Sequence, residues 1–131
     1  MDKDKLDVFV HKKLNYWWGR LGLTSTTPCT YRLANIEGKN TTGQVFIDNR
    51  YGSVNFVFDA NKLEHYPKKE VEHLIIHECS HVLVSEITRV AKRVIDVYVE
   101  DEKAKKLAEE LIADEEESFC DLLADKLGRK R

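Results

Sequence analysis

The sequence predicts a single α+β domain, on three observations. Its 131 residues suit one domain that buries its own core. Helical periodicity occupies the N-terminal stretch, and polar and apolar residues alternate over short runs in the middle. The last half contains long helical runs with no proline after Pro67. We expect an N-terminal helix, a small, mostly antiparallel sheet of about three strands, a long helix that carries two histidines, and a C-terminal helix rich in glutamate.

The first predicted element is an amphipathic helix over residues 4–18. Its apolar side chains include Leu6, Val10 and Leu14, and glycines at positions 19 and 22 mark its exit. Trp17 and Trp18 could form a binding surface. Core anchoring is the role that we predict for them, because large aromatic side chains dominate the burial energy of small domains.

Three strands are predicted next. Residues 30–34 alternate weakly, residues 43–48 alternate better, and residues 53–59 alternate clearly between polar and apolar side chains. Joined by short turns, these segments most simply form the largely antiparallel sheet.

Pro67 is a natural start for the long helix, since a proline in the first turn loses no hydrogen bond. From Val71 to about Val90 the chain has neither glycine nor proline. At 100° per residue, one side of this helix collects apolar side chains that we expect to build the core: Ile75, Ile76, Cys79, Val82, Leu83, Ile87 and Val90. Residues 94–99 could extend the helix or form a short extended piece, and residues 101–113 are predicted to be helical, with inward-facing Leu107, Leu111 and Ile112.

The opposite side of the long helix carries the sequence His77-Glu78-Cys79-Ser80-His81. Two histidines four residues apart point the same way and can share one metal ion, for which zinc is the usual occupant. Glu78 lies beside that face, where it can act as a general base toward a water activated by the metal. His73 lies one turn earlier on the same face; we interpret it as a cleft-wall or surface residue, because three successive turns are too far apart to share one ion.

A catalytic zinc site usually has three protein ligands and one open position. None of the five histidines follows His81, so a downstream ligand has to be a carboxylate. The predicted C-terminal helix has an apolar face made of Ile112, Phe119, Leu122, Leu123 and Leu127. Glu117 lies off that face and is the best-placed ligand, with Glu116 as the alternative.

The pair of motifs, His77-Glu78-x-x-His81 and Glu117-x-x-x-Asp121, resembles the gluzincin metallopeptidases of the thermolysin clan. The small size is similar to that of the minigluzincins and of short phage or prokaryotic proteins. The resemblance implies a zincin-like fold, Zn²⁺ held by the two histidines and Glu117, and Asp121 as the outer partner of a ligand histidine. The chain departs from the family at Glu116, where the larger enzymes have asparagine.

These residues predict a zinc-dependent peptidase that acts on a peptide or protein substrate, with Glu78 as general base. Donors to the transition state could be Tyr98, Arg89, Arg93 or His65. The alternative is a non-catalytic zinc-binding module or latent pseudoprotease with the same fold. A third hypothesis makes the histidines accidental in an ordinary α+β protein.

Composition and net charge limit the classes of binding partner and the cellular compartment that we expect for this chain. The net charge of −2 gives no general attraction to nucleic acid, and no apolar run approaches the length of a membrane span. The three cysteines are too few and too scattered for a disulfide framework, and the first residues lack the apolar region of a signal peptide. We therefore expect a cytoplasmic protein without membrane partners.

Overall fold

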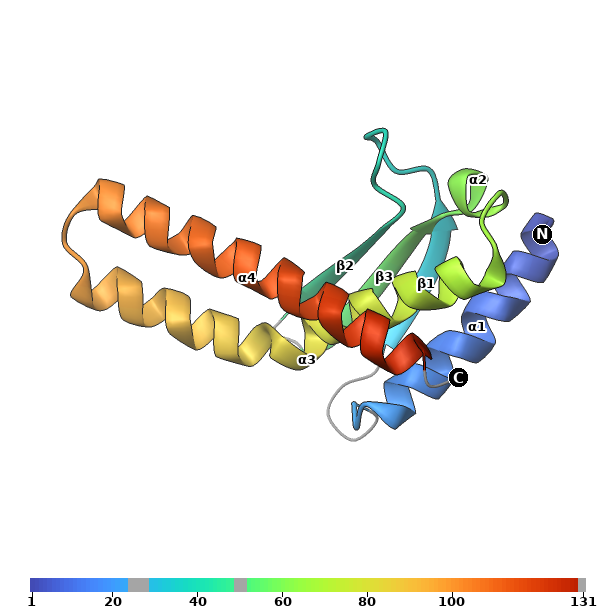
Figure 1. Ribbon diagram of the computed structural model, residues 1–131, viewed down its shortest axis with the longest axis horizontal. Helices are drawn as coiled ribbons and strands as arrows, with labels where there is room; N and C mark the ends of the chain where they lie inside the picture. The colour runs from blue at the N-terminus through green and yellow to red at the C-terminus, as the bar shows by residue number, and fades with distance from the viewer. Residues whose placement is uncertain (24–28, 49–51, 130–131) are drawn as a thin grey trace.

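A computed structural model describes residues 1–23, 29–48 and 52–129. The elements follow the chain in this order: α1 Lys3–Arg20, β1 Cys29–Ala34, β2 Gly43–Asp48, β3 Ser53–Asp59, α2 Ala60–Leu63, α3 Lys68–Tyr98 and α4 Glu102–Arg129. The predicted α+β class is confirmed: an N-terminal helix and a three-stranded sheet pack with two long C-terminal helices (Figure 1).

Helix α1 forms as its sequence predicts. The Asp2 side chain accepts a hydrogen bond from the backbone N–H of Lys5 at 2.8 Å and so caps the first turn. One face of the helix is buried, with Leu6, Val10, Leu14, Trp17 and Trp18 in the hydrophobic core. The prediction that the two tryptophans anchor the core is therefore confirmed.

The sheet has the strand order β1-β3-β2. Strand β2 pairs with β3 in antiparallel fashion, as expected, whereas β1 pairs with β3 in parallel. The expectation of a mostly antiparallel sheet is wrong for this second pairing. Short turns would have placed β1 beside β2, but β1 instead takes the free side of the central strand β3, whose Val54, Phe56 and Phe58 are buried.

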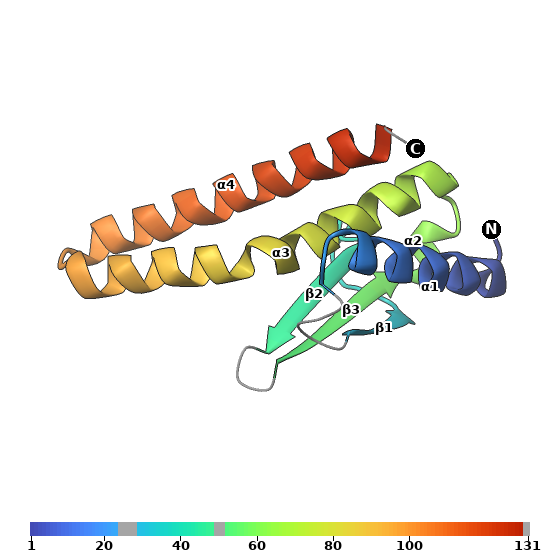
Figure 2. The ribbon, with the colours of Figure 1, turned by 90° about the horizontal axis from the view of Figure 1, so that it is seen from below.

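Helices α3 and α4 form a long antiparallel hairpin. Figure 2 shows α3 between α4 and the sheet. Residues 91–98 continue α3, which decides between the two conformations that the sequence allows there. Asp101 then begins α4 by accepting a hydrogen bond from the backbone N–H of Lys103 at 3.2 Å. In Figure 1 the tip of this hairpin extends well beyond the sheet and α1.

That extension corrects part of the predicted core. Ile75, Ile76 and Cys79 are fully buried, but Leu83, Ile87 and Val90 are 43%, 74% and 53% exposed. On α4, Leu107, Leu111, Phe119 and Leu122 are exposed as well, and the buried residues are Cys120 and Ala124. Helical periodicity shows which side chains share a face; it does not show where the rest of the domain ends.

Strand β2 approaches the N-terminal half of α3 closely at Gly43. A Cβ atom there would lie 3.2 Å from Leu74 Cδ1 and 3.3 Å from Phe58 Cδ1. The small residue brings an edge strand against the helix that carries the histidines. Within the described residues, no helix combines the length and the apolar character that crossing a bilayer requires.

Candidate metal centre

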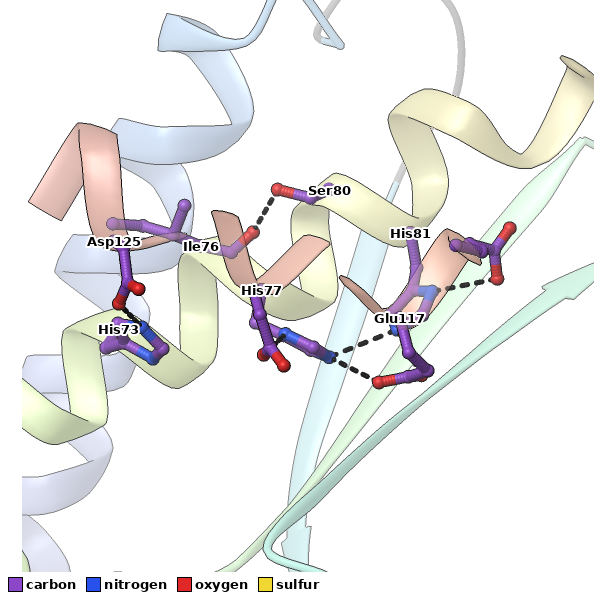
Figure 3. Close-up of polar contacts among 9 residues, drawn as sticks. His73, Ile76, His77, Ser80, His81, Glu117 and Asp125 are labelled. Carbon is purple, nitrogen blue, oxygen red and sulfur yellow. Dashed lines mark hydrogen bonds and ion pairs between the residues drawn. The ribbon is translucent and has the colours of Figure 1, made fainter. Parts of the chain in front are cut away.

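The histidine motif lies in the part of α3 that the rest of the domain holds in place. Cys79 and Ser80 are fully buried, and the Ser80 hydroxyl donates to the carbonyl of Ile76 at 2.7 Å. Burial raises the pKa of the Cys79 thiol far above its usual range, so this cysteine behaves as a small apolar side chain. With this face in the core, α3 turns His77 and His81 toward α4 (Figure 3).

The two histidines meet one carboxylate of α4. His81 Nε2 lies 2.9 Å from Glu117 Oε1, His77 Nε2 lies 3.2 Å from Glu117 Oε2, and the two Nε2 atoms are 3.2 Å apart. Figure 3 shows the three side chains converging between the helices. His77, His81 and Glu117 could therefore hold one metal ion.

Both imidazoles are also held on their outer nitrogens by acidic side chains of α4. His77 Nδ1 lies 2.8 Å from Asp121 Oδ1, and His81 Nδ1 lies 3.0 Å from Glu116 Oε2. The Thr88 hydroxyl is 2.7 Å from the other oxygen of Glu116. The structure therefore places Glu117 between the inner nitrogens, and Glu116, the alternative ligand, on the far side of His81.

The geometry of the triad fits a metal such as zinc. Bonds of 2.0–2.1 Å in a tetrahedral arrangement separate neighbouring ligand atoms by roughly 3.3 Å. The two Nε2 atoms are 3.2 Å apart, and one ligand atom from each of the three residues lies within 4.8 Å of the others. If each Nδ1–H donates to its acidic partner, both Nε2 atoms present lone pairs toward Glu117. Three acceptors that face one another in this way are suited to share a metal cation.

Glu78 lies next to the triad and is buried, with 7% of its surface exposed. Burial raises the pKa of its carboxyl to about 7; the neighbouring His81 opposes the rise and the negative charge of Glu117 adds to it. Glu78 nevertheless borders the open space beside the triad. It is thus shielded from solvent over most of its surface and still borders the space that a bound molecule would occupy.

A cleft passes along the triad on both sides. One lobe, of about 580 Å³, is lined by β2 from Gly43 to Ile47 and by the α3 residues Glu78, His81, Arg89 and Lys92. The other, of about 560 Å³, is lined by residues 40–43, Tyr66 and His77 among others. Gly43, Glu78 and Glu117 border both lobes, so the triad lies between them.

The remaining predicted residues are divided between the cleft and the rest of the surface. His73 lines the second lobe, and its Nε2 lies 2.9 Å from Asp125 Oδ1, which agrees with a role in the cleft wall. Of the four proposed donors, Arg89 lines the first lobe, whereas Arg93 and His65 line neither lobe. Tyr98 is 79% exposed at the last position of α3, far along the hairpin.

Sequence reasoning missed the link from Thr88 through Glu116 to His81. The available signal was spacing: Thr88 follows His81 by seven residues, which returns a helix to nearly the same face. Threonine is common on helix surfaces, so this spacing alone indicates no role. Its partner Glu116 is brought to it only when α4 packs on α3.

Comparisons with protein-family models, curated proteins and solved structures found no significant match to this chain. The resemblance in the motifs therefore stays a prediction, and the description of the site stands on its geometry. That geometry gives a metal centre in which two histidines of α3 and one glutamate of α4 could bind the ion.

Proposed function

We propose that this protein is a zinc-dependent peptidase in which His77, His81 and Glu117 hold the metal and Glu78 is the general base. The observation that carries this proposal is the convergence of His77 Nε2, His81 Nε2 and the Glu117 carboxylate beside a cleft that Glu78 borders. Three protein ligands, rather than four, are typical of a catalytic zinc ion with one open position.

When bound at such a site, zinc lowers the pKa of a water to about 7 and polarises a carbonyl group. Glu78 accepts the proton as the water attacks the scissile carbonyl, and it later gives that proton to the leaving amine. Asp121 and Glu116 hold the imidazoles so that Nε2, and not Nδ1, points inward.

Strand β2 offers a way to align the substrate. Within the described part of the chain it pairs only with β3, and its residues 43–47 line the cleft. An extended peptide could add to this edge, with its backbone N–H and C=O groups paired to those of β2. This supports a peptide or protein as the substrate.

The test compares Glu78→Gln with His77→Ala. Glu78→Gln should keep stoichiometric zinc and lose cleavage of labelled casein and of a broad peptide library, whereas His77→Ala should lose both. Glu109→Gln, an exposed change on α4, is the control and should keep zinc and cleavage. Zinc bound by the wild type with no cleavage of any peptide would favour the non-catalytic module, and full activity in Glu78→Gln would refute the assignment.

A further inference from the structure

The outer half of the α3–α4 hairpin, here called the arm, consists of residues 83–98 of α3 and 102–119 of α4. Within the arm the two helices meet through half-buried residues of modest size or mixed polarity: Val84, Thr88, Ala91 and Ile95 on α3, and Lys105, Ala108, Ile112 and Glu116 on α4. This contact gives the arm little apolar core of its own.

A row of larger apolar side chains lies outside that contact. Leu83, Ile87, Val90, Val94 and Val97 are 43%, 74%, 53%, 50% and 63% exposed. Their spacing of four, three, four and three residues is the heptad spacing of a helix that packs against another helix. Nothing in the described residues covers this row.

Helix α4 adds a second row on the same side. Leu107 and Leu111 are 59% and 56% exposed, and each stands one position before a residue of the α3–α4 contact. Ile87 and Val90 stand in the same relation to the contact residues of α3. In an α-helix, the side chain one position before a contact residue points 100° away from it around the helix axis. Because the helices are antiparallel, the same offset points both rows to one side of the arm. Arg89 and Lys92, one position after contact residues, line the cleft on the other side.

We infer that this apolar face binds the arm of a second copy of the chain, forming a four-helix bundle. A two-fold axis along the arm sets α3 of one copy against α4 of the other, so that every helix has antiparallel neighbours. An exposed two-helix apolar face of this kind is rare on a monomer. The clefts of both copies then face away from the interface.

A complementary charge pair at the rim of the face favours a second copy as the occupant. The Thr88–Glu116 contact and the Asp96–Lys105 ion pair fix which turns of α3 and α4 lie at the same level. On that scale Arg93 is level with the partner's Glu110, so a basic and an acidic side chain meet at the rim. Glu86 is already paired with Arg89 of its own chain at 2.8 Å. Leu107 of the partner falls between Val94 and Val97, as a side chain inserted between two others should.

Sedimentation velocity of the full chain over a range of concentrations tests the inference. The wild type should sediment as twice the 15.2 kDa chain, and the double variant Val90→Glu/Val94→Glu should raise the dissociation constant more than about tenfold. Both positions are exposed, so circular dichroism should show an unchanged helical content. Val8→Glu, at a 68% exposed valine of α1, is the matched control and should remain dimeric.

A charge swap tests the arrangement itself. Arg93→Glu should weaken the dimer by juxtaposing acidic groups, and Arg93→Glu/Glu110→Arg should restore it. A wild type that stays monomeric at all concentrations would overturn the inference, as would a dimer that Val90→Glu/Val94→Glu leaves intact. A swap that fails to restore the dimer would overturn the two-fold arrangement.

Discussion

Glu116 Oε2 lies 3.0 Å from Nδ1 of His81, on the side of the imidazole that faces away from the metal centre. Its second oxygen is held by the Thr88 hydroxyl at 2.7 Å. His77 has the equivalent partner in Asp121 at 2.8 Å. Each candidate ligand of α3 is thus fixed from behind by a carboxylate of α4, and α4 also supplies the third candidate ligand.

This relationship gives a first prediction. Glu116→Ala should weaken zinc binding by about 10- to 100-fold, the usual cost of losing an outer partner of a metal ligand. Glu116→Gln, which keeps an acceptor for the His81 N–H, should lose less. Competition against a chelator measures both, with no need for a substrate. Equal affinities in the wild type and Glu116→Ala would show that the contact does not position His81.

Metal binding should also stabilise the fold, because the candidate ligands come from two helices. Zinc at about 100 times its dissociation constant adds roughly 2.7 kcal/mol, which corresponds to a rise in Tm of about 10 °C for a domain of this size. Thermal unfolding with and without a chelator measures the shift. His77→Ala should show almost none, and a shift of the same size in that variant would place the zinc elsewhere.

The first lobe of the cleft predicts a preference in the substrate. Arg89 and Lys92 lie along it beyond His81, and Arg89 is already paired with Glu86 at 2.8 Å. We expect peptides with an acidic side chain at this end to be cleaved about two- to fivefold better than neutral ones, the range of an exposed ion pair.

Lys92→Glu should reverse that preference, as a comparison of kcat/KM for acidic, neutral and basic peptides would reveal. Lys126→Glu, on an exposed residue near the end of α4 that lines neither lobe, is the control. An unchanged preference in Lys92→Glu would mean that the substrate does not enter this lobe.

Asp59 predicts a dependence of stability on pH. It is buried and accepts hydrogen bonds from the backbone N–H groups of Ile36 at 2.8 Å and Lys62 at 3.1 Å. The bond from Ile36 is the main reason that its pKa lies below the ordinary 3.8. A carboxyl with a depressed pKa stabilises the fold above its unfolded pKa, and this contribution is lost as the pH falls through the folded value.

Asp59→Asn should therefore be less stable than the wild type by about 1–3 kcal/mol at neutral pH, and the difference should shrink below about pH 4. Urea unfolding at several pH values measures it. Glu37→Gln, an exposed change in the nearby loop, should alter neither quantity. A difference that stays constant down to low pH would mean that the Asp59 charge does not contribute.

Local patterns in the sequence were enough for the elements and for part of the site. Helix α1, the three strands and the face that carries His77 and His81 follow from periodicity, because each is decided by neighbouring residues. The parallel pairing of β1 with β3 does not follow, since it depends on which edge of the sheet is free after β2 has paired. Glu116 illustrates the same limit: the sequence places it near the ligands, but only the docking of α4 on α3 decides which nitrogen it meets.

The cleft has a lobe on either side of the triad. The first lobe extends along β2 to Ile47 and along α3 to Lys92, and the second extends to Tyr66 and His73. A peptidase with this layout would admit a polypeptide that continues past the site in both directions. The expected reaction is therefore cleavage within a chain, with two peptides as the first products, rather than the release of single amino acids from an end.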